Sequence, residues 1–173
     1  MTTERNFIPL GIAILTVSDT RTEENDTSGA KLQAMLEADG HHLTDKVIVP
    51  DDRYLIRAII SRWIADDAVS AIITTGGTGL TGRDGTPEAV LPLLDKIIDG
   101  FGEMFRMLSY EKIKTSTIQS RAMAGVANAT FIFCLPGSTG ACKDGWNMLI
   151  STQLDYRTRP CNLVELIPRL NEK

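Results

Sequence analysis

The sequence predicts an α/β protein whose mostly parallel sheet is covered by helices on both faces. Short apolar runs without polar alternation, such as GIAILTV at 11–17, are typical of strands that are buried on both sides. These runs alternate along the chain with amphipathic segments of helical periodicity, which is the order of β-α-β units. A chain of 173 residues has room for one domain and hardly two, so we expect residues 1–173 to form a single domain.

Composition and charge exclude several classes of protein. With 43% hydrophobic and 23% charged residues, the chain is neither disordered, nor collagen-like, nor a coiled coil. A net charge of −4 without a basic run argues against non-specific nucleic-acid binding. Three cysteines without a C-x-x-C pair favour a reducing compartment. No apolar run approaches the roughly 18 residues of a membrane span, and the first ten residues lack a signal-peptide core. We therefore expect a cytoplasmic protein.

The first half of the chain predicts three strands separated by two helices. The strands are expected over 11–17, 43–49 and 69–75. Asp26, Thr27 or Ser28 caps the first helix, which Gly40 ends. Asp51 or Asp52 caps the second helix. Its apolar pairs recur every four residues and predict one broad buried face: Leu55/Ile56, Ile59/Ile60 and Trp63/Ile64.

The second half begins with a glycine-rich loop over 76–85. We expect Thr86 to cap the next helix, with Pro87 in its first turn and one buried face made by Val90, Leu91, Leu94, Ile97 and Ile98. Further helices are expected over 101–112, over 117–127 and from the turn at 136–140 to about 154. A strand is expected over 130–135, and the tail after 155 is expected to be irregular.

A few residues with reactive or large side chains receive structural interpretations. His41 and His42 are adjacent, lack the spaced partners of a zinc site and are expected in a solvated loop. Cysteines 134 and 142 have no visible activating partner. We expect core packing for Cys134, Trp63, Trp146, Met148 and Leu149.

Polar residues and glycines follow the ends of four predicted strands. Because the carboxyl ends of parallel strands share one edge of a sheet, and ligands bind outside that edge, we expect these distant segments to line one rim. The segments are Ser18-Asp19, Asp51-Asp52, the loop with Thr75, Thr78 and Asp84, and Gly137-Ser138-Thr139. Arg21, Arg83 and Lys143 are candidate cations near this rim.

The glycine-rich loop is the clearest candidate for a binding site. It holds five glycines in ten residues, more than a tight connection needs. Glycines permit positive φ, and their bare N–H groups form an anion nest to which the following helix adds its positive end. The candidate binding residues here are Thr75, Gly76, Gly77, Thr78 and Gly79. The turn of Pro136, Gly137 and Ser138 is a second such nest, so the rim predicts a ligand with two anionic ends.

Residues 77–82 fit the pattern G-x-G-x-x-G, which raises the alternative of an NAD-dependent enzyme. That fingerprint belongs after the first strand of the sheet and needs an acid about 20 residues further on, at the end of the next strand. Here the loop follows the third strand, and Asp99 ends a predicted helix. The NAD alternative is therefore disfavoured, and a Walker A loop is excluded because no lysine is present.

Two carboxylates at the rim suggest a metal. Asp84 lies inside the glycine-rich loop and would repel a bound phosphate unless a cation intervened, and Mg²⁺ is usually held by carboxylates together with phosphates. Asp51 and Asp84 are therefore candidate Mg²⁺ ligands for a bound Mg-nucleotide or another polyphosphate. The alternatives are a helix cap for Asp51 and a turn residue for Asp84. For Ser18 and Asp19, capping and ligand contact are both open.

The motifs taken together resemble one known family from about Ile12 to Pro160. They are TGGTG at 75–79, Asp84 with TPE at 86–88, GFGE at 100–103, Arg106, Ser109, SR at 120–121 and LPGS at 135–138. The sequence is identified as a member of the molybdopterin-binding MoaB/MogA family, shared with gephyrin-type proteins. Residues 154–162 are similar to its MoaB branch.

The resemblance implies a three-layer α/β/α fold, self-association as a trimer or hexamer, and binding of molybdopterin, a pterin dithiolene with a terminal phosphate. Active family members adenylylate that phosphate with Mg-ATP and release pyrophosphate. Their two essential acids correspond to Asp51 and Asp84, and their ligand-binding segments to 76–79 and 136–138. The alternative function is a molybdopterin carrier without turnover.

Overall fold

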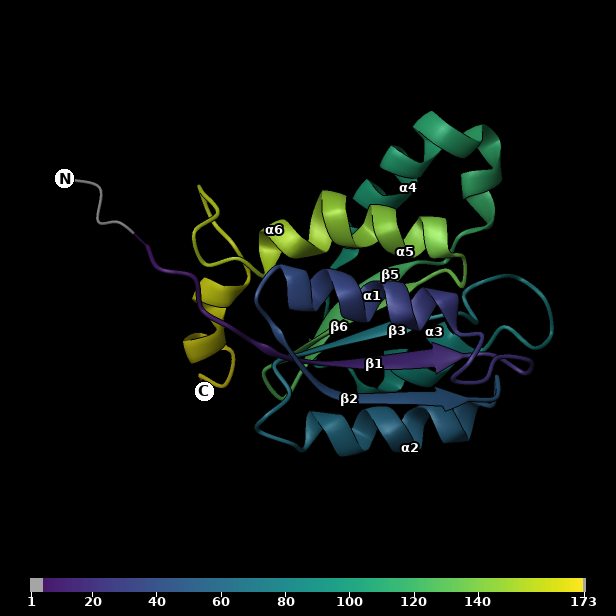
Figure 1. Ribbon diagram of the computed structural model, residues 1–173, viewed down its shortest axis with the longest axis horizontal. Helices are drawn as coiled ribbons and strands as arrows, with labels where there is room; N and C mark the ends of the chain where they lie inside the picture. Colours follow the sequence, from purple (N-terminus) through teal and green to yellow (C-terminus); the bar gives the residue numbers. More distant parts are fainter. Residues whose placement is uncertain (1–4, 173) are drawn as a thin grey trace.

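The computed structural model describes residues 5–172, and within this range six strands form one sheet in the order β2-β1-β3-β6-β5-β4 (Figure 1). The strands are β1 Gly11–Val17, β2 His42–Val49, β3 Ala71–Thr75, β4 Lys96–Ile97, β5 Met123–Ala127 and β6 Thr130–Leu135. β1 pairs in parallel with β2 and β3, and β3 with β6, whereas β5 is antiparallel to β6 and β4. The predicted mostly parallel sheet is confirmed. The expectation about a signal peptide falls partly on residues 1–4, outside the described range.

Helices cover both faces of the sheet and make three layers (Figure 1). The helices are α1 Thr27–Ala38, α2 Arg53–Ile64, α3 Thr86–Val90, α4 Asp99–Ile113, α5 Thr139–Gly145 and α6 Ser151–Gln153. The 3₁₀ segments are η1 Leu91–Leu93, η2 Lys114–Gln119 and η4 Val164–Arg169, and η3 Trp146–Ile150 is a π-helical turn. Along β1, Ile12 and Ile14 pack with α1, whereas Ala13 and Leu15 pack on the opposite face with α2. This double burial explains the unbroken apolar run in the sequence.

Two helix caps decide which acidic side chains remain available. Asp26 caps α1 by accepting from Gly29 N at 2.9 Å, and Gly40 follows that helix with φ +94°, as predicted. Asp52 caps α2 by accepting from Tyr54 N at 2.9 Å and Leu55 N at 3.0 Å. Of the two candidate caps for α2, Asp52 therefore takes this role.

The predicted helix after the glycine-rich loop is wrong in length and in its cap. α3 ends at Val90, because Pro92 lies in the following 3₁₀ turn, Leu91–Leu93, and the chain then extends into β4. Leu91 and Ile97 are consequently exposed. Gly85 occupies the N-cap position, and the Thr86 hydroxyl instead donates to Gly76 O at 2.9 Å.

The helix predicted over 117–127 is also wrong. η2 ends at Gln119, and β5 forms a hairpin with β6 through Asn128 and Ala129, which have φ of 46° and 65°. Two positive φ angles are typical of a type I′ turn, whose usual signal is Asn-Gly. Alanine at the second position removed that signal, and the small residues of β5 carry little strand preference.

Several other expectations can be compared with burial. Trp63, Trp146 and Cys134 are buried as predicted, whereas Met148 is partly exposed. His41 is buried instead of solvated: its Nδ1 accepts from Leu10 N at 3.2 Å, and burial lowers its pKa. Burial raises the pKa of the Cys134 thiol to about 12, so this cysteine is unreactive.

In residues 5–172, no helix is long and apolar enough to span a membrane.

Helix α2 offers a direct test of which apolar face supports the fold. Ile60 is fully buried, whereas Leu55 on the same helix is 47% exposed. We expect Ile60→Ala to lower the free energy of unfolding by about 2–5 kcal/mol and Leu55→Ala by less than about 1 kcal/mol. Urea denaturation of both variants measures the difference, and equal losses would contradict the packing described for α2.

Candidate functional site

The carboxyl ends of the parallel strands surround a cavity of about 590 Å³. The arrowheads of β1 and β2 point toward this edge in Figure 1. Its lining includes Ser18 and Asp19 after β1, Asp51 after β2, the stretch from Gly76 to Gly79 with Asp84 after β3, and Pro136 to Ser138 after β6. The predicted rim is therefore assembled from four separate segments.

Gly76 and Gly77 are needed for these segments to approach one another. Both have positive φ, +105° and +66°. A Cβ on Gly76 would lie 2.1 Å from Val17 O, and one on Gly77 would lie 2.3 Å from Thr86 Oγ1 and 2.8 Å from Asp51 Oδ2. A Cβ on Gly137 would lie only 3.3 Å from Gly76 Cα, so the two predicted nests are in contact. Any larger residue at 76 or 77 would separate β3 from β1 and α3.

The backbone of the glycine-rich loop has N–H groups that are available as hydrogen-bond donors. Within residues 5–172, the N–H groups of Gly77 and Thr78 donate to no other protein group. Ser138 caps α5 by accepting from Ala141 N at 3.1 Å. Free N–H groups beside a helix start suit an anion, as the sequence predicts.

Thr75 has a different role from the one expected. It is buried, lies outside the cavity lining, and donates from its hydroxyl to Pro136 O at 3.1 Å. Thr75 therefore ties the end of β3 to the turn after β6 and has no exposed polar atom for a ligand.

Asp51 contacts two other segments of the rim, through Asp19 and Gly85. Its Oδ1 accepts from Gly85 N at 3.1 Å. Burial raises the pKa of Asp51 above its ordinary 3.8, the Gly85 hydrogen bond opposes the rise, and the nearby charges of Asp84 and Asp19 add to it. Asp51 is thus a carboxylate whose negative charge would be favoured by an added cation.

Asp84 and Asp19 each hold part of the backbone as well as lining the cavity. Asp84 Oδ2 accepts from Thr81 Oγ1 at 2.6 Å and from Thr81 N at 2.8 Å, and the hydroxyl bond is the main reason that the pKa of Asp84 is lowered. Asp19 accepts from Asp51 N at 3.1 Å and pairs with Arg83 at 2.6 Å, which lowers the pKa of Asp19. A turn role for Asp84 and a capping role for Asp19 are therefore compatible with a place beside a ligand.

Ser18 also combines the two roles left open by the sequence. Its Oγ accepts from Thr20 N and Arg21 N, both at 3.2 Å, and the residue lines the cavity. Of the three candidate cations, Arg83 lines this cavity, Arg21 lines a neighbouring groove and Lys143 lines a smaller cavity that shares Ser138.

One wall of the cavity was not expected from the strand-end rule. It comes from α4 and η2 and includes Phe105, Ser109, Ile113, Ser116, Gln119 and Ser120. The family motifs contain Ser109 and Ser120, but no local pattern in the sequence indicates that this helical arm folds over the strand ends.

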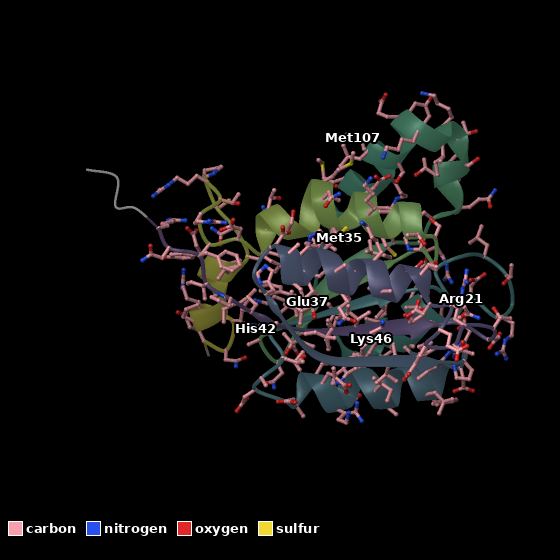
Figure 2. The ribbon with its side chains drawn as sticks, in the orientation of Figure 1. Arg21, Met35, Glu37, His42, Lys46 and Met107 are labelled. Atoms are coloured by element: carbon pink, nitrogen blue, oxygen red, sulfur yellow. The ribbon has the colours of Figure 1, made fainter. Side chains whose placement is uncertain are left out.

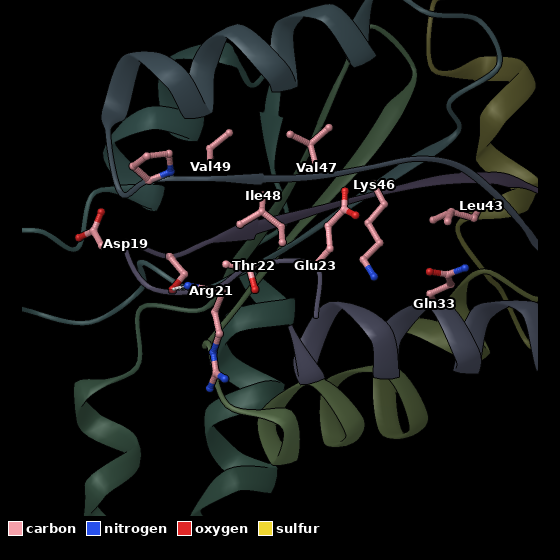
Figure 3. A pocket seen from close by; sticks show the side chains of 12 residues that line it. Asp19, Arg21, Thr22, Glu23, Gln33, Leu43, Lys46, Val47, Ile48 and Val49 are labelled. Carbon is pink, nitrogen blue, oxygen red and sulfur yellow. Dashed lines mark hydrogen bonds between the residues drawn. The ribbon is translucent and has the colours of Figure 1, made fainter. Parts of the chain in front are cut away.

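A larger groove of about 790 Å³ adjoins the site along the edge strand β2 (Figure 3). It shares Ser18 and Asp19 with the cavity, and its floor includes Ile48 and Lys46. Figure 2 places Arg21 near the carboxyl end of the sheet and His42 at the opposite end. No residue of either glycine loop lines this groove, so the smaller cavity is the candidate site.

The described residues contain no group of three or more His, Cys, Asp or Glu side chains that could hold a metal alone. Asp51 and Asp84 supply two carboxylates. This donor set fits Mg²⁺, which is commonly bound by one or two carboxylates together with ligand phosphates and water.

Comparison with known proteins gives consistent matches. The family model described as "Probable molybdopterin binding domain" matches residues 13–156. Molybdenum cofactor biosynthesis protein B of Escherichia coli (strain K12) is 60% identical over 156 residues, covering 90% of this chain and 92% of that protein. A crystal structure of molybdenum cofactor biosynthesis protein B has a TM-score of 0.84 at 43% identity and covers 87% and 94% of the two chains. The tungsten cofactor synthesizing protein MoaB from Pyrococcus furiosus has a TM-score of 0.76 at 35% identity and covers 83% and 91%.

The opposite pKa shifts of Asp51 and Asp84 predict opposite effects on stability. A carboxyl with a raised pKa binds its proton more tightly in the folded state, so its contribution to stability falls as pH rises from 3.8 through the raised value. Asp84, with a lowered pKa, contributes stability that is lost as pH falls below 3.8. We therefore expect Asp51→Asn to raise and Asp84→Asn to lower the melting temperature near neutral pH.

Both differences are expected to shrink on acidification, and scanning calorimetry between about pH 3 and pH 7 measures them. Melting-temperature differences of the same sign, or differences that do not change with pH, would contradict the electrostatic description of the site.

Proposed function

This chain belongs to the molybdopterin-binding MoaB/MogA family, and we propose that it acts in molybdenum cofactor biosynthesis by binding molybdopterin at the carboxyl edge of its sheet. The proposal rests on one observation: the loops at 76–79 and 136–138 line the same cavity as Asp51 and Asp84. A pterin with a terminal phosphate needs one anion nest, and a second nest beside it suits a second phosphate-bearing ligand.

The reaction that these residues suit is adenylyl transfer. An oxygen of the molybdopterin phosphate would attack the α-phosphorus of ATP, and the bond to the bridging oxygen would break to release pyrophosphate. The attacking oxygen is already anionic near neutral pH, so no general base is required. This agrees with a cavity whose described lining contains no histidine.

The remaining obstacle is repulsion between two anionic substrates. The loops at 76–79 and 136–138 would hold the phosphates, and Asp51 and Asp84 would hold Mg²⁺, which neutralises charge on the transferring phosphoryl group. Catalysis in this proposal comes from positioning and charge neutralisation.

A carrier without turnover is the alternative function. In a carrier, Asp51 would serve only as a helix cap, but the cap of α2 is Asp52. The bonds of Asp84 to Thr81 still allow a purely structural role for that acid. The two functions therefore differ in whether either carboxylate is needed for AMP transfer.

A single-turnover assay with molybdopterin, Mg²⁺ and ATP tests the proposal. We expect adenylylated molybdopterin with the wild type and a loss of about 10²–10³-fold in rate with Asp51→Asn or Asp84→Asn, because each removes a preorganised charge. Molybdopterin binding should be retained. Asp52→Asn is the matched control, since asparagine also caps helices and the rate should stay near that of the wild type. Binding without any product in the wild type would favour the carrier.

We also propose self-association through α4. Met104, Met107 and Tyr110 recur every three residues along this helix and are each 42% to 57% exposed. Figure 2 shows Met107 on α4, at the margin of the molecule. A contiguous exposed apolar stripe is typical of a protein–protein interface, and a second copy of this chain is the proposed partner.

Sedimentation velocity measures this association directly. We expect the wild type to sediment as a species larger than the 18.9 kDa chain, and Met107→Glu to shift the population toward the monomer because it buries a charge in the interface. Tyr54→Glu, on α2, is the control and should not change the sedimentation coefficient. A monomeric wild type, or an unchanged Met107→Glu oligomer, would contradict this interface.

A further inference from the structure

The side chain of Arg121, in the segment between η2 and β5, contacts the glycine-rich loop at several points. Its Nε donates to Gly79 O at 2.8 Å and its Nη2 donates to Asp84 O at 3.0 Å. Its Nη1 pairs with the Glu88 carboxylate in the first turn of α3, and its backbone N donates to Thr78 O at 3.1 Å. One guanidinium therefore fixes two carbonyls of the loop and the helix that follows it.

The contact with Asp84 O reaches further, to the other acid of the site. The carbonyl of the Asp84–Gly85 peptide accepts from Arg121, and the N–H of the same peptide donates to Asp51 Oδ1 at 3.1 Å. A peptide whose carbonyl is bonded to a cation is polarised, which strengthens its N–H as a donor. The guanidinium, the peptide and the Asp51 carboxylate thus form one chain of hydrogen bonds.

We propose that Arg121 is a positioning residue that keeps Asp51 and Asp84 in fixed relative positions by holding the Asp84–Gly85 peptide. The inference rests on the proposed adenylyl transfer for its functional consequence. Arg121 does not line the cavity, so it acts through the loop and not on a ligand. Lysine cannot replace it, because a single ammonium lacks the planar fork that reaches two carbonyls and a carboxylate at once.

The chain contains a matched control for this arginine. Arg57, on α2, donates from Nε to Ala89 O at 3.1 Å and from Nη2 to Glu88 O at 2.8 Å. It holds two carbonyls of α3 in the same chemical manner but bonds neither to the loop nor to the two acids. Comparing the two arginines separates a general loss of stability from a loss of site geometry.

The experiment compares Arg121→Lys with Arg57→Lys in the full chain. Hydrogen exchange of the unliganded protein is followed by mass spectrometry. Amide exchange over 78–86 should be about tenfold faster in Arg121→Lys and unchanged in Arg57→Lys. The reason is that local opening of the loop becomes easier only where the Arg121 contacts are lost. In the AMP-transfer assay, kcat should fall by about 10–100-fold in Arg121→Lys with little change in the KM for molybdopterin.

Should Arg121→Lys fail to fold, Glu88→Gln provides a milder variant. It removes the carboxylate that orients the guanidinium and keeps both carbonyl contacts, so loop exchange should rise by about two- to threefold. Unchanged loop exchange in the variant that folds would overturn the proposal, and so would faster exchange with an unchanged kcat. A wild type that transfers no AMP would defeat the proposed function, while the exchange data would still decide whether Arg121 holds the loop.

Discussion

The close approach of backbone at Gly76 and Gly77 is the constraint on which the rest of the site depends. A side chain at either position would overlap Val17 O or Thr86 Oγ1, and both residues have φ values that L side chains rarely adopt. Thr86 then holds the two glycines by donating from its hydroxyl to Gly76 O and from its N–H to Gly77 O. The start of the loop is therefore held by backbone contacts. Its N–H groups at Gly77 and Thr78, for which the described residues provide no acceptor, belong to residues that line the cavity.

The same closeness has an electrostatic cost. With no side chain at Gly77, the Asp51 carboxylate approaches the loop that carries Asp84, and the two charges raise the free energy of the ionised site. Arg83 pairs with Asp19 at the exposed margin and offsets only part of this repulsion. Such an arrangement lowers the stability of the unliganded protein. Lower stability is common in sites whose binding residues are held in place before the ligand arrives. A cation bound together with phosphates would complete the charge balance.

The sequence was most informative where structure is encoded locally. The strands β1, β3 and β6 were predicted because strands buried on both faces carry continuous apolar runs. The edge strand β2 is only partly buried and was predicted from the stretch that Pro50 ends. The parallel arrangement then placed the ends of these four strands at one edge. β5 was missed because Met123–Ala127 is short, small in side chain and reached through a turn without glycine. The length of α3 was overestimated because the apolar residues up to Ile98 fit a helical period, whereas Leu91–Leu93 form a 3₁₀ turn and Lys96–Ile97 form a short exposed strand.

The site itself shows where local patterns stop being sufficient. Asp51 and Asp52 are adjacent acids after the same proline, and no local rule distinguishes which one caps α2. A contact with Gly85, 34 residues away, occupies Asp51 and leaves the cap to Asp52. Likewise, the hydrogen bonds of Arg121 to Gly79, Asp84 and Glu88 join residues 33 to 42 positions apart, so no local sequence pattern predicts them. The scaffold of the rim is thus specified by short apolar segments, whereas the relative placement of its acids is specified by a few long-range hydrogen bonds to backbone. Substitutions that spare the core can therefore disable such a site while leaving the fold intact.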